Sequence, residues 1–154
     1  MRSIPEDRGA ASGGDLSELA ARLRLSIART ARRLRQEAGV DLSPSQTAAL
    51  ATIERHGPLT PTELARAEGI QRPTATRIVA HLEEADLVER TADPADRRSF
   101  AISASAHGKG LLRRLRSRKN AYLARQLQRL EQEDVATLAR ATELLEEMLE
   151  GERR

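Results

Sequence analysis

A chain of 154 residues, 39% hydrophobic and 32% charged with a formal net charge of +3, fits one soluble globular domain with a core of its own. The chain holds no cysteine, which excludes disulfides, thiolate metal sites and thiol-based redox sensing. No apolar run approaches the ~20 residues of a membrane span, and the N-terminus lacks the apolar region of a signal peptide, so we expect a cytoplasmic protein that does not enter a membrane.

The first predicted element is a long helix that follows a short tail. Residues 1–14 are small, polar and glycine-containing, and we expect a flexible tail there. From Asp15 to about Ala38, apolar residues recur at steps of three and four, which predicts one helix with a single apolar stripe that Gly39 terminates. The stripe consists of Leu16, Leu19, Leu23, Ile27, Ala31 and Leu34.

Two further helices begin with the same local signal. In "SPSQ", Ser43 is the expected N-cap, a proline takes the first helical position, and Gln46 closes a capping box. In "TPTE", Thr60 and Glu63 repeat the arrangement. We expect the first of these helices to run to about residue 56 and the second, shorter one to end near residue 69.

A fourth helix and two strands follow. The helix is expected from about Arg72 to Ala85, and the strands at "LVER" and "SFAI". Ordinary hairpin loops have about 2–5 residues, whereas this loop runs from Thr91 to Arg98 and is strongly charged. A loop that is longer than usual and rich in arginine suggests a contact with a partner.

Two long helices complete the chain. Ser105 caps the fifth, which carries a leucine stripe that ends with Leu127 and Leu130, and the sixth runs from about residue 132 to 149. On one side the sixth helix carries Val135, Leu138, Leu145 and Met148. Since Phe100 and Tyr122 are the only aromatic residues, the core must be aliphatic, which favours a mainly helical fold.

The stretch at residues 61–90 predicts a helix-turn-helix. Ala65 is small enough for two helices to cross closely, and Gly69 suits the tight turn between them. In the second helix the expected buried face consists of Ala75, Ile78, Val79 and Leu82, and the polar residues before and along the opposite face are Gln71, Arg72, Thr74, Thr76, Arg77 and His81. That polar face suits the DNA major groove, and the threonine-rich N-terminus suits phosphate oxygens. The alternative is an ordinary helical corner with a solvated polar face.

The hairpin that follows makes the DNA-binding interpretation more specific. A helix-turn-helix followed directly by a hairpin with a basic tip is a winged helix-turn-helix, whose tip arginine can enter the minor groove. Asp96 lies two residues before Arg98 and can orient its guanidinium, and Arg97 adds a second cation at the tip. The alternative is a self-neutralising surface turn formed by Asp93, Asp96, Arg97 and Arg98.

With these motifs in place, the chain resembles the MarR family of bacterial transcription regulators over residues 15–149. The resemblance rests on "LTPTELARAEGIQRPTATRIVAHLEEADLVER" and on the wing "DPADRRSFAIS". It implies a triangular homodimer in which residues 15–40 and 105–150 form dimerisation helices and residues 41–104 form a DNA-binding lobe. It also implies that small molecules bind between these two regions and shift the spacing of the recognition helices.

Two positions depart from the family pattern. Asp86 stands where the family usually has glycine before the first wing strand; aspartate tolerates a left-handed backbone, so we expect the turn to persist. The sixth helix lacks the serine or threonine cap that is usual in the family and begins with "EQED", whereas Ser105 and Gly108 match the threonine and glycine that the family commonly has at the start of the fifth. Neither departure changes the expected fold class, which is mainly α with a small β-hairpin wing and long N- and C-terminal dimerisation helices.

The arginine usage leaves two interpretations open. Lys109 and Lys119 are the only lysines, which reflects either a codon bias or a preference for phosphate contact. The basic run "RRLRSRKN" in the fifth helix fits a solvated face with intersubunit ion pairs better than a second DNA patch. The three histidines have no second ligand at metal spacing, so we expect no metal site and no cofactor.

The expected function is therefore a homodimeric, sequence-specific DNA-binding transcription regulator, a repressor at a pseudo-palindromic operator, with a small-molecule effector that the sequence does not identify. Rival interpretations are an architectural DNA-binding protein with little sequence preference and a helical protein-interaction module without DNA binding. An enzyme is disfavoured because the chain has no cysteine, no paired histidine and carboxylate, and no glycine-rich phosphate loop. The residues expected at the dimer interface are Leu16, Leu19, Leu23, Leu127, Val135, Leu138, Leu145 and Met148.

Overall fold

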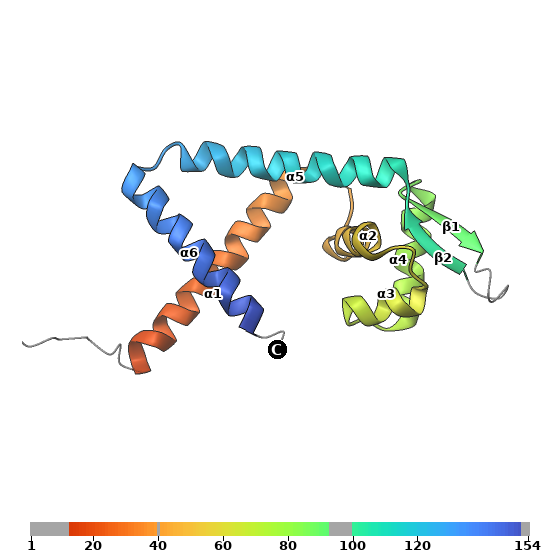
Figure 1. The fold of residues 1–154 in the computed structure, drawn as a ribbon, viewed down its shortest axis with the longest axis horizontal. Helices are drawn as coiled ribbons and strands as arrows, with labels where there is room; N and C mark the ends of the chain where they lie inside the picture. The colour runs from red at the N-terminus through yellow and green to blue at the C-terminus, as the bar shows by residue number, and fades with distance from the viewer. Residues whose placement is uncertain (1–12, 40, 93–99, 152–154) are drawn as a thin grey trace, which may run out of the picture. The chain divides into compact units, whose positions relative to one another are not determined.

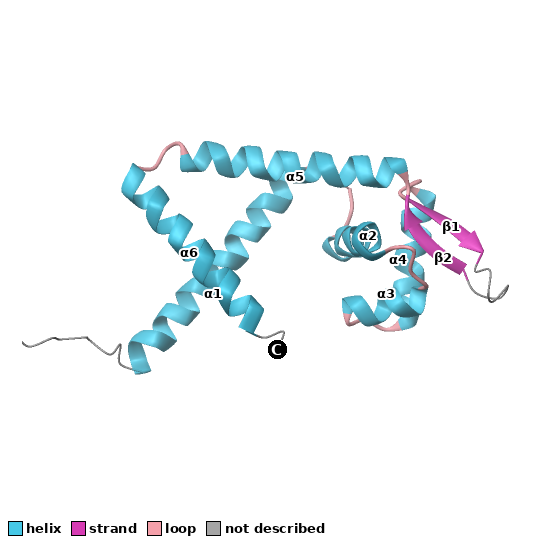
Figure 2. Ribbon diagram, viewed as in Figure 1, coloured by secondary structure: helices cyan, strands magenta, loops and turns pink. Residues whose placement is uncertain are grey.

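A computed structural model describes residues 13–39, 41–92 and 100–151. The described elements are α1 (Gly13–Ala38), α2 (Pro44–His56), α3 (Pro61–Glu68), α4 (Arg72–Glu84), β1 (Val88–Ala92), β2 (Phe100–Ala104), α5 (Ala106–Leu127) and α6 (Gln132–Gly151) (Figure 1). Figure 2 shows that the regular elements are helices apart from the two strands, with loops between them. The prediction of a mainly helical fold with a small hairpin is confirmed, and the helix boundaries agree with the sequence to within a few residues.

The chain divides into two compact units, Met1–Gln36 and Glu37–Arg154. In the first unit, α1 carries Asp15 in its first turn, where a negative charge favours the helix dipole. None of residues 14–36 is buried, and Leu16 and Leu19 are each 57% exposed. Of the apolar stripe that the sequence predicts on this helix, Leu16, Leu19 and Ile27 are therefore exposed, and the other three residues are half-buried.

The two predicted capping boxes begin α2 and α3. The Ser43 amide donates to Gln46 Oε1 at 2.8 Å, and the Gln46 amide donates to Ser43 Oγ at 3.2 Å. At α3 the corresponding distances between Thr60 and Glu63 are 2.8 and 3.2 Å. Hydrogen bonds from the Thr60 amide and hydroxyl lower the pKa of the Glu63 carboxyl. Both helix starts are thus determined by four-residue signals, and these predictions are confirmed.

The core of the second unit is aliphatic, as the scarcity of aromatic residues predicts. Phe100 lies only half-buried at its edge. The largest fully buried side chains are Leu50, Ile53, Leu64, Leu82, Ile102 and Val79, which come from α2, α3, α4 and β2. The core therefore joins the helix pair α3–α4 to both α2 and the hairpin, and this places the helices and the wing in one lobe.

The hairpin is longer at its first strand than the sequence suggests. β1 and β2 are antiparallel, with Val88 opposite Ala104 and Arg90 opposite Ile102. Thr91, which we expected to begin the loop, pairs with Ala101 instead, and the ladder continues through the next pair. Cross-strand pairing thus extends the strand past the apolar residues that signal it. The remainder of the predicted loop, residues 93–98, lies outside the described residues.

A backbone pair that the sequence does not reveal ties the hairpin to the lobe. The Leu59 amide donates to the Ile102 carbonyl at 3.0 Å, and the Ile102 amide donates back to the Leu59 carbonyl at 2.8 Å. Leu59 lies in the connection between α2 and α3. A single residue between a proline and a helix cap has no alternating pattern, so nothing in the sequence signals this bridge.

Ser105, the N-cap of α5, and two arginines of α5 connect that helix to the rest of the second unit. The Ser105 hydroxyl donates to the Asp86 carbonyl at 2.7 Å and accepts from the Gly108 amide at 2.9 Å. Asp86 has a φ of 56°, so the expected left-handed turn is present. In the basic run, Arg116 pairs with Glu54 of α2, and Arg118 donates to a backbone carbonyl at 2.9 Å. These two arginines thus have partners in the same chain rather than the intersubunit partners we expected.

Gly108 is expected to tolerate no side chain. A Cβ at this position would lie 2.1 Å from the Leu87 carbonyl oxygen, so Gly108→Ala should destabilise the protein by about 1–3 kcal/mol. Gly110 is the matched control, because its Cβ would meet only the ends of two arginine side chains, Arg114 at 3.5 Å and Arg113 at 3.8 Å. Gly110→Ala should stabilise the helix by about 0.5–1 kcal/mol. Urea unfolding at one protein concentration measures both changes, and equal shifts for the two variants would contradict the packing argument.

Candidate nucleic-acid interface

The turn between α3 and α4 has the geometry that a helix-turn-helix requires. Gly69 terminates α3 with a φ of 63°, in the left-handed region that favours glycine. The next amide, of Ile70, donates to the Ala65 carbonyl at 2.9 Å, and Ala65 itself is buried. The small residue and the turn glycine thus occupy the positions that the sequence predicts for them.

The two faces of α4 differ sharply in exposure. Its buried residues are Ala75, Ile78, Val79 and Leu82, the four that the helical spacing predicts. At 100° per residue, Arg77 points directly away from this buried stripe. The exposed residues before and along the helix include Gln71, Arg72, Thr76, Arg77 and His81. The lobe thus presents one face of a firmly packed helix to its surroundings.

The structure distinguishes among the polar residues that the sequence groups together. Thr74 is half-buried. The Thr76 hydroxyl donates to the Arg72 carbonyl at 3.0 Å, so it satisfies its own helix. His81 Nδ1 lies 3.6 Å from a carboxylate oxygen of Glu84. Among the described residues, neither Arg72 nor Arg77 has an ion-pair partner, so their guanidinium groups are the most available donors on this face.

The predicted tip residues of the wing, Asp96, Arg97 and Arg98, lie outside the described residues. The described part of the hairpin instead carries an interaction that sequence reasoning missed. Arg90 of β1 forms a two-point hydrogen bond with Glu83 of α4, and both distances are 2.7 Å. This carboxylate raises the pKa of the Arg90 guanidinium. One signal was present in the sequence: alternation from Val88 places a charged residue on the inward face of β1.

The described residues offer few candidate sites of other kinds. Over residues 13–39, 41–92 and 100–151, no three His, Cys, Asp or Glu side chains are placed to hold a metal ion. No helix in these ranges is both long and apolar enough to cross a membrane. A shallow hollow of about 440 Å³ is present in the second unit, with Leu42, Leu87, Leu111, His107, Arg114 and Arg118 among its lining residues.

A packed helix pair with a left-handed glycine at its turn, an exposed basic face on the second helix and a hairpin directly after it define a winged helix-turn-helix DNA-binding protein. The comparisons with known proteins agree: the model of the MarR family matches residues 42–100. An uncharacterized HTH-type transcriptional regulator of Mycobacterium leprae is 32% identical over 135 residues, which cover 87% of this chain and 94% of that protein. The chain belongs to the MarR family of transcription regulators.

Solved structures extend the similarity to nearly the whole fold. The crystal structure of a protein from Pseudomonas aeruginosa described as a transcriptional regulator has a TM-score of 0.80 and 34% identity, and the match covers 90% of this chain and 97% of that one. A mutant of Staphylococcus aureus MepR bound to an oligodeoxyribonucleotide has a TM-score of 0.69 at 21% identity, with 84% and 97% covered. The second likeness concerns the fold alone.

Proposed function

We propose that this chain is a homodimeric transcription repressor that binds a pseudo-palindromic DNA operator in a sequence-specific manner. The observation that carries the proposal is the exposed face of α4, where Arg77 points away from the buried stripe and has no ion-pair partner among the described residues. We propose repression because a repressor needs only to bind a promoter tightly, with no further contact to other proteins.

The residues of α4 would divide between base and phosphate contacts. Arg77 is suited to guanine, because a guanidinium can donate to O6 and N7 together. Arg72 lies at the start of the helix, where backbone amides also favour phosphate oxygens. Gln71, Thr74, Thr76 and His81 complete the proposed recognition surface. The Thr76 hydroxyl would have to turn from its backbone acceptor to reach DNA, so we assign it a smaller contribution to the binding free energy.

For the wing, we propose that Arg98 enters a minor groove next to the major groove occupied by α4. Arg97 would add a phosphate contact, and Asp96 would orient Arg98. This part of the proposal rests on the sequence motif. The described base of the hairpin supports it only in being packed into the same lobe as α4, through Ile102 and Val88.

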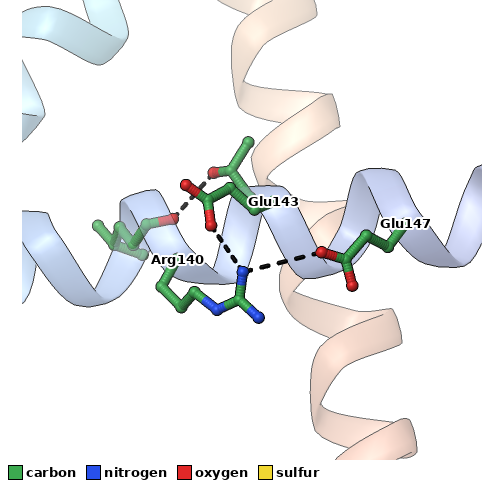
Figure 3. Close-up of polar contacts among 5 residues, drawn as sticks. Arg140, Glu143 and Glu147 are labelled. Carbon is green, nitrogen blue, oxygen red and sulfur yellow. Dashed lines mark hydrogen bonds and ion pairs between the residues drawn. The ribbon is translucent and has the colours of Figure 1, made fainter.

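Dimerisation is supported by two exposed apolar stripes. No residue of α6 is buried, and Leu138 and Met148 are 45% and 63% exposed. On the opposite side of α6, Arg140 contacts Glu143 at 2.7 Å and Glu147 at 3.8 Å (Figure 3). Because these charged side chains are exposed and pair with one another, we assign this side of α6 to solvent. The remaining residues proposed for the interface are half-exposed or exposed: Leu16, Leu19, Leu23, Leu127, Val135 and Leu145.

The charges of the two helices also favour association between copies. The sequence of α1 contains six arginines and three acidic residues, whereas that of α6 contains one arginine and six acidic residues. A basic helix and an acidic helix with apolar stripes complement each other when they come from two chains. We therefore propose that the partner is a second copy of this chain.

We also propose that the effector is a small amphipathic anion. The hollow of about 440 Å³ is lined by apolar side chains, by two guanidinium groups and by one carboxylate, so the positive groups outnumber the negative one. These lining residues include Leu42, Leu87, Leu111, His107, Arg114, Arg118 and Asp41. Apolar walls with a few polar groups are typical of small-molecule sites. The named lining residues come from α5 and from the lobe, so a bound molecule could alter the packing of α5 against the lobe.

Selection of bound sequences from a random duplex pool tests the proposal. We expect an inverted repeat whose half-sites are separated by about 10 base pairs or a multiple, because a two-fold dimer presents two copies of α4. Light scattering at micromolar concentration should give twice the chain mass of 17.0 kDa. Bound sequences without an inverted repeat would favour the architectural rival. The absence of salt-dependent binding to any duplex would favour the protein-interaction rival.

A further inference from the structure

Three side chains from three consecutive elements meet at the outer part of the hairpin. Glu83 comes from the last turn of α4, Arg90 from β1 and Phe100 from the start of β2. Arg90 Nε donates to Glu83 Oε1 and Arg90 Nη2 to Glu83 Oε2, each at 2.7 Å. The Arg90 guanidinium carbon also lies 3.7 Å from the centre of the Phe100 ring. The edge of the Arg90 guanidinium thus donates hydrogen bonds to Glu83 of α4, and its flat face lies over the Phe100 ring of β2.

The register explains why these groups meet. Arg90 pairs with Ile102, and Ala92 pairs with Phe100, so Arg90 and Phe100 are diagonal neighbours on one face of the hairpin. That face is the inward one, because Ile102 is fully buried. Arg90 itself is exposed at the edge of that face, and Glu83, one turn beyond the buried Val79, lies within reach of its guanidinium.

We propose that Arg90 is a positioning residue, which sets the orientation of the wing relative to the recognition helix α4 through Glu83 and Phe100. This inference rests on the proposed function, in which α4 and the wing contact one operator. The hairpin is otherwise packed at its base, where Val88, Ile102 and Ala104 are buried. Phe100 lies two residues from Ile102, about 7 Å toward the outer end of the hairpin at 3.3 Å per residue. The contact therefore acts where a small rotation of the hairpin would move its end the most.

Arginine is required for this geometry. Its planar group can form the two-point bond and lie over a ring at the same time, whereas a lysine ammonium keeps only the charge. The pair contributes little to overall stability, because the side chains of Arg90 and Glu83 are 48% and 26% exposed. Its effect would instead be preorganisation: a wing held in place before binding loses less conformational freedom when DNA is bound.

The experiment compares two neighbouring carboxylates of α4. Glu83→Gln and Glu84→Gln remove the same charge from the same helix end, but only Glu83 contacts Arg90. We expect Glu83→Gln and Arg90→Lys to weaken operator binding about tenfold by fluorescence anisotropy at one stated salt concentration. Glu84→Gln should tighten binding slightly, because it removes a negative charge from the exposed side of α4 and releases His81, whose Nδ1 lies 3.6 Å from the Glu84 carboxylate. In the double variant Glu83→Gln/Arg90→Gln, the loss should not exceed that of Arg90→Gln alone.

A second readout in the free protein separates positioning from a phosphate contact. In the parent protein we expect an Arg90 Nε–H signal in ¹⁵N NMR spectra that exchanges slowly with water, and amides of β1 as rigid as those of α4. Glu83→Gln should make both mobile while thermal unfolding shifts by no more than about 4 °C. Equal binding by Glu83→Gln and Glu84→Gln, with parent binding intact, would overturn the positioning role alone. A parent protein that binds no duplex would overturn the proposed function and this inference together.

Discussion

Arg77→Ala is expected to cause a large loss of operator affinity together with a loss of preference at one base pair of each half-site. A two-point bond from arginine to guanine contributes about 1–3 kcal/mol of discrimination. A symmetric operator presents it twice, so the variant should bind at least about thirtyfold more weakly. Stability should not change, because Arg77 is exposed and points away from the buried face of α4. The measurement is anisotropy on the selected operator and on duplexes with each base replaced at the affected position.

The control for Arg77→Ala is Arg129→Ala. Arg129 lies two residues beyond the end of α5, and it is exposed. The lobe packs against the first half of α5, at Gly108, Leu112 and Leu115. The control therefore removes one positive charge about 20 Å or more along the helix from those contacts, at 1.5 Å per residue. If Arg77→Ala lowered affinity equally for all duplexes and reduced the salt dependence, Arg77 would contact phosphate, and its assignment to base readout would be wrong.

The features that the sequence predicts well are those determined within a few residues. Ser43 and Thr60 cap their helices through partners three positions on, and Gly69 and Asp86 adopt the left-handed backbone that their turns require. The buried face of α4 follows from helical spacing alone. These signals lie in neighbouring residues, so no knowledge of the tertiary structure is needed to interpret them.

The features that the sequence does not predict join residues far apart in the chain. Arg118 donates to the Ala38 carbonyl across 80 positions, and Arg116 pairs with Glu54 across 62. Within the candidate site, helical spacing placed Thr74 and Thr76 on the same polar face as the arginines. Only the structure shows that Thr74 is half-buried and that the Thr76 hydroxyl bonds its own helix. Which polar groups remain available depends on the tertiary packing and on the local acceptors.

Breaking the proposed dimer is expected to weaken operator binding strongly without any change in α4. Leu138 and Leu145 lie on the apolar stripe of α6, and Leu138 is 45% exposed in the single chain. Replacing both with glutamate would place two more negative charges in an interface that we propose to be apolar at its centre, and burying an unpaired charge is strongly unfavourable. The chain should then have a mass of 17.0 kDa at micromolar concentration. Its helical circular dichroism should be retained, since α6 has no buried residue within the chain.

A monomer would hold only one half-site, and it would lose the second contact that the linked partner supplies at high effective concentration. The affinity for the operator should therefore fall about 100-fold or more, while binding to a single half-site stays close to that of the parent protein. Ala136→Glu is the matched control. It adds a glutamate to the same helix on the side where Arg140 contacts Glu143 and Glu147, which we assign to solvent (Figure 3). This control should remain a dimer and bind the operator normally. A double variant that stays dimeric would show that the stripe on α6 lies outside the interface, and equal monomerisation by Ala136→Glu would place the interface on the opposite face.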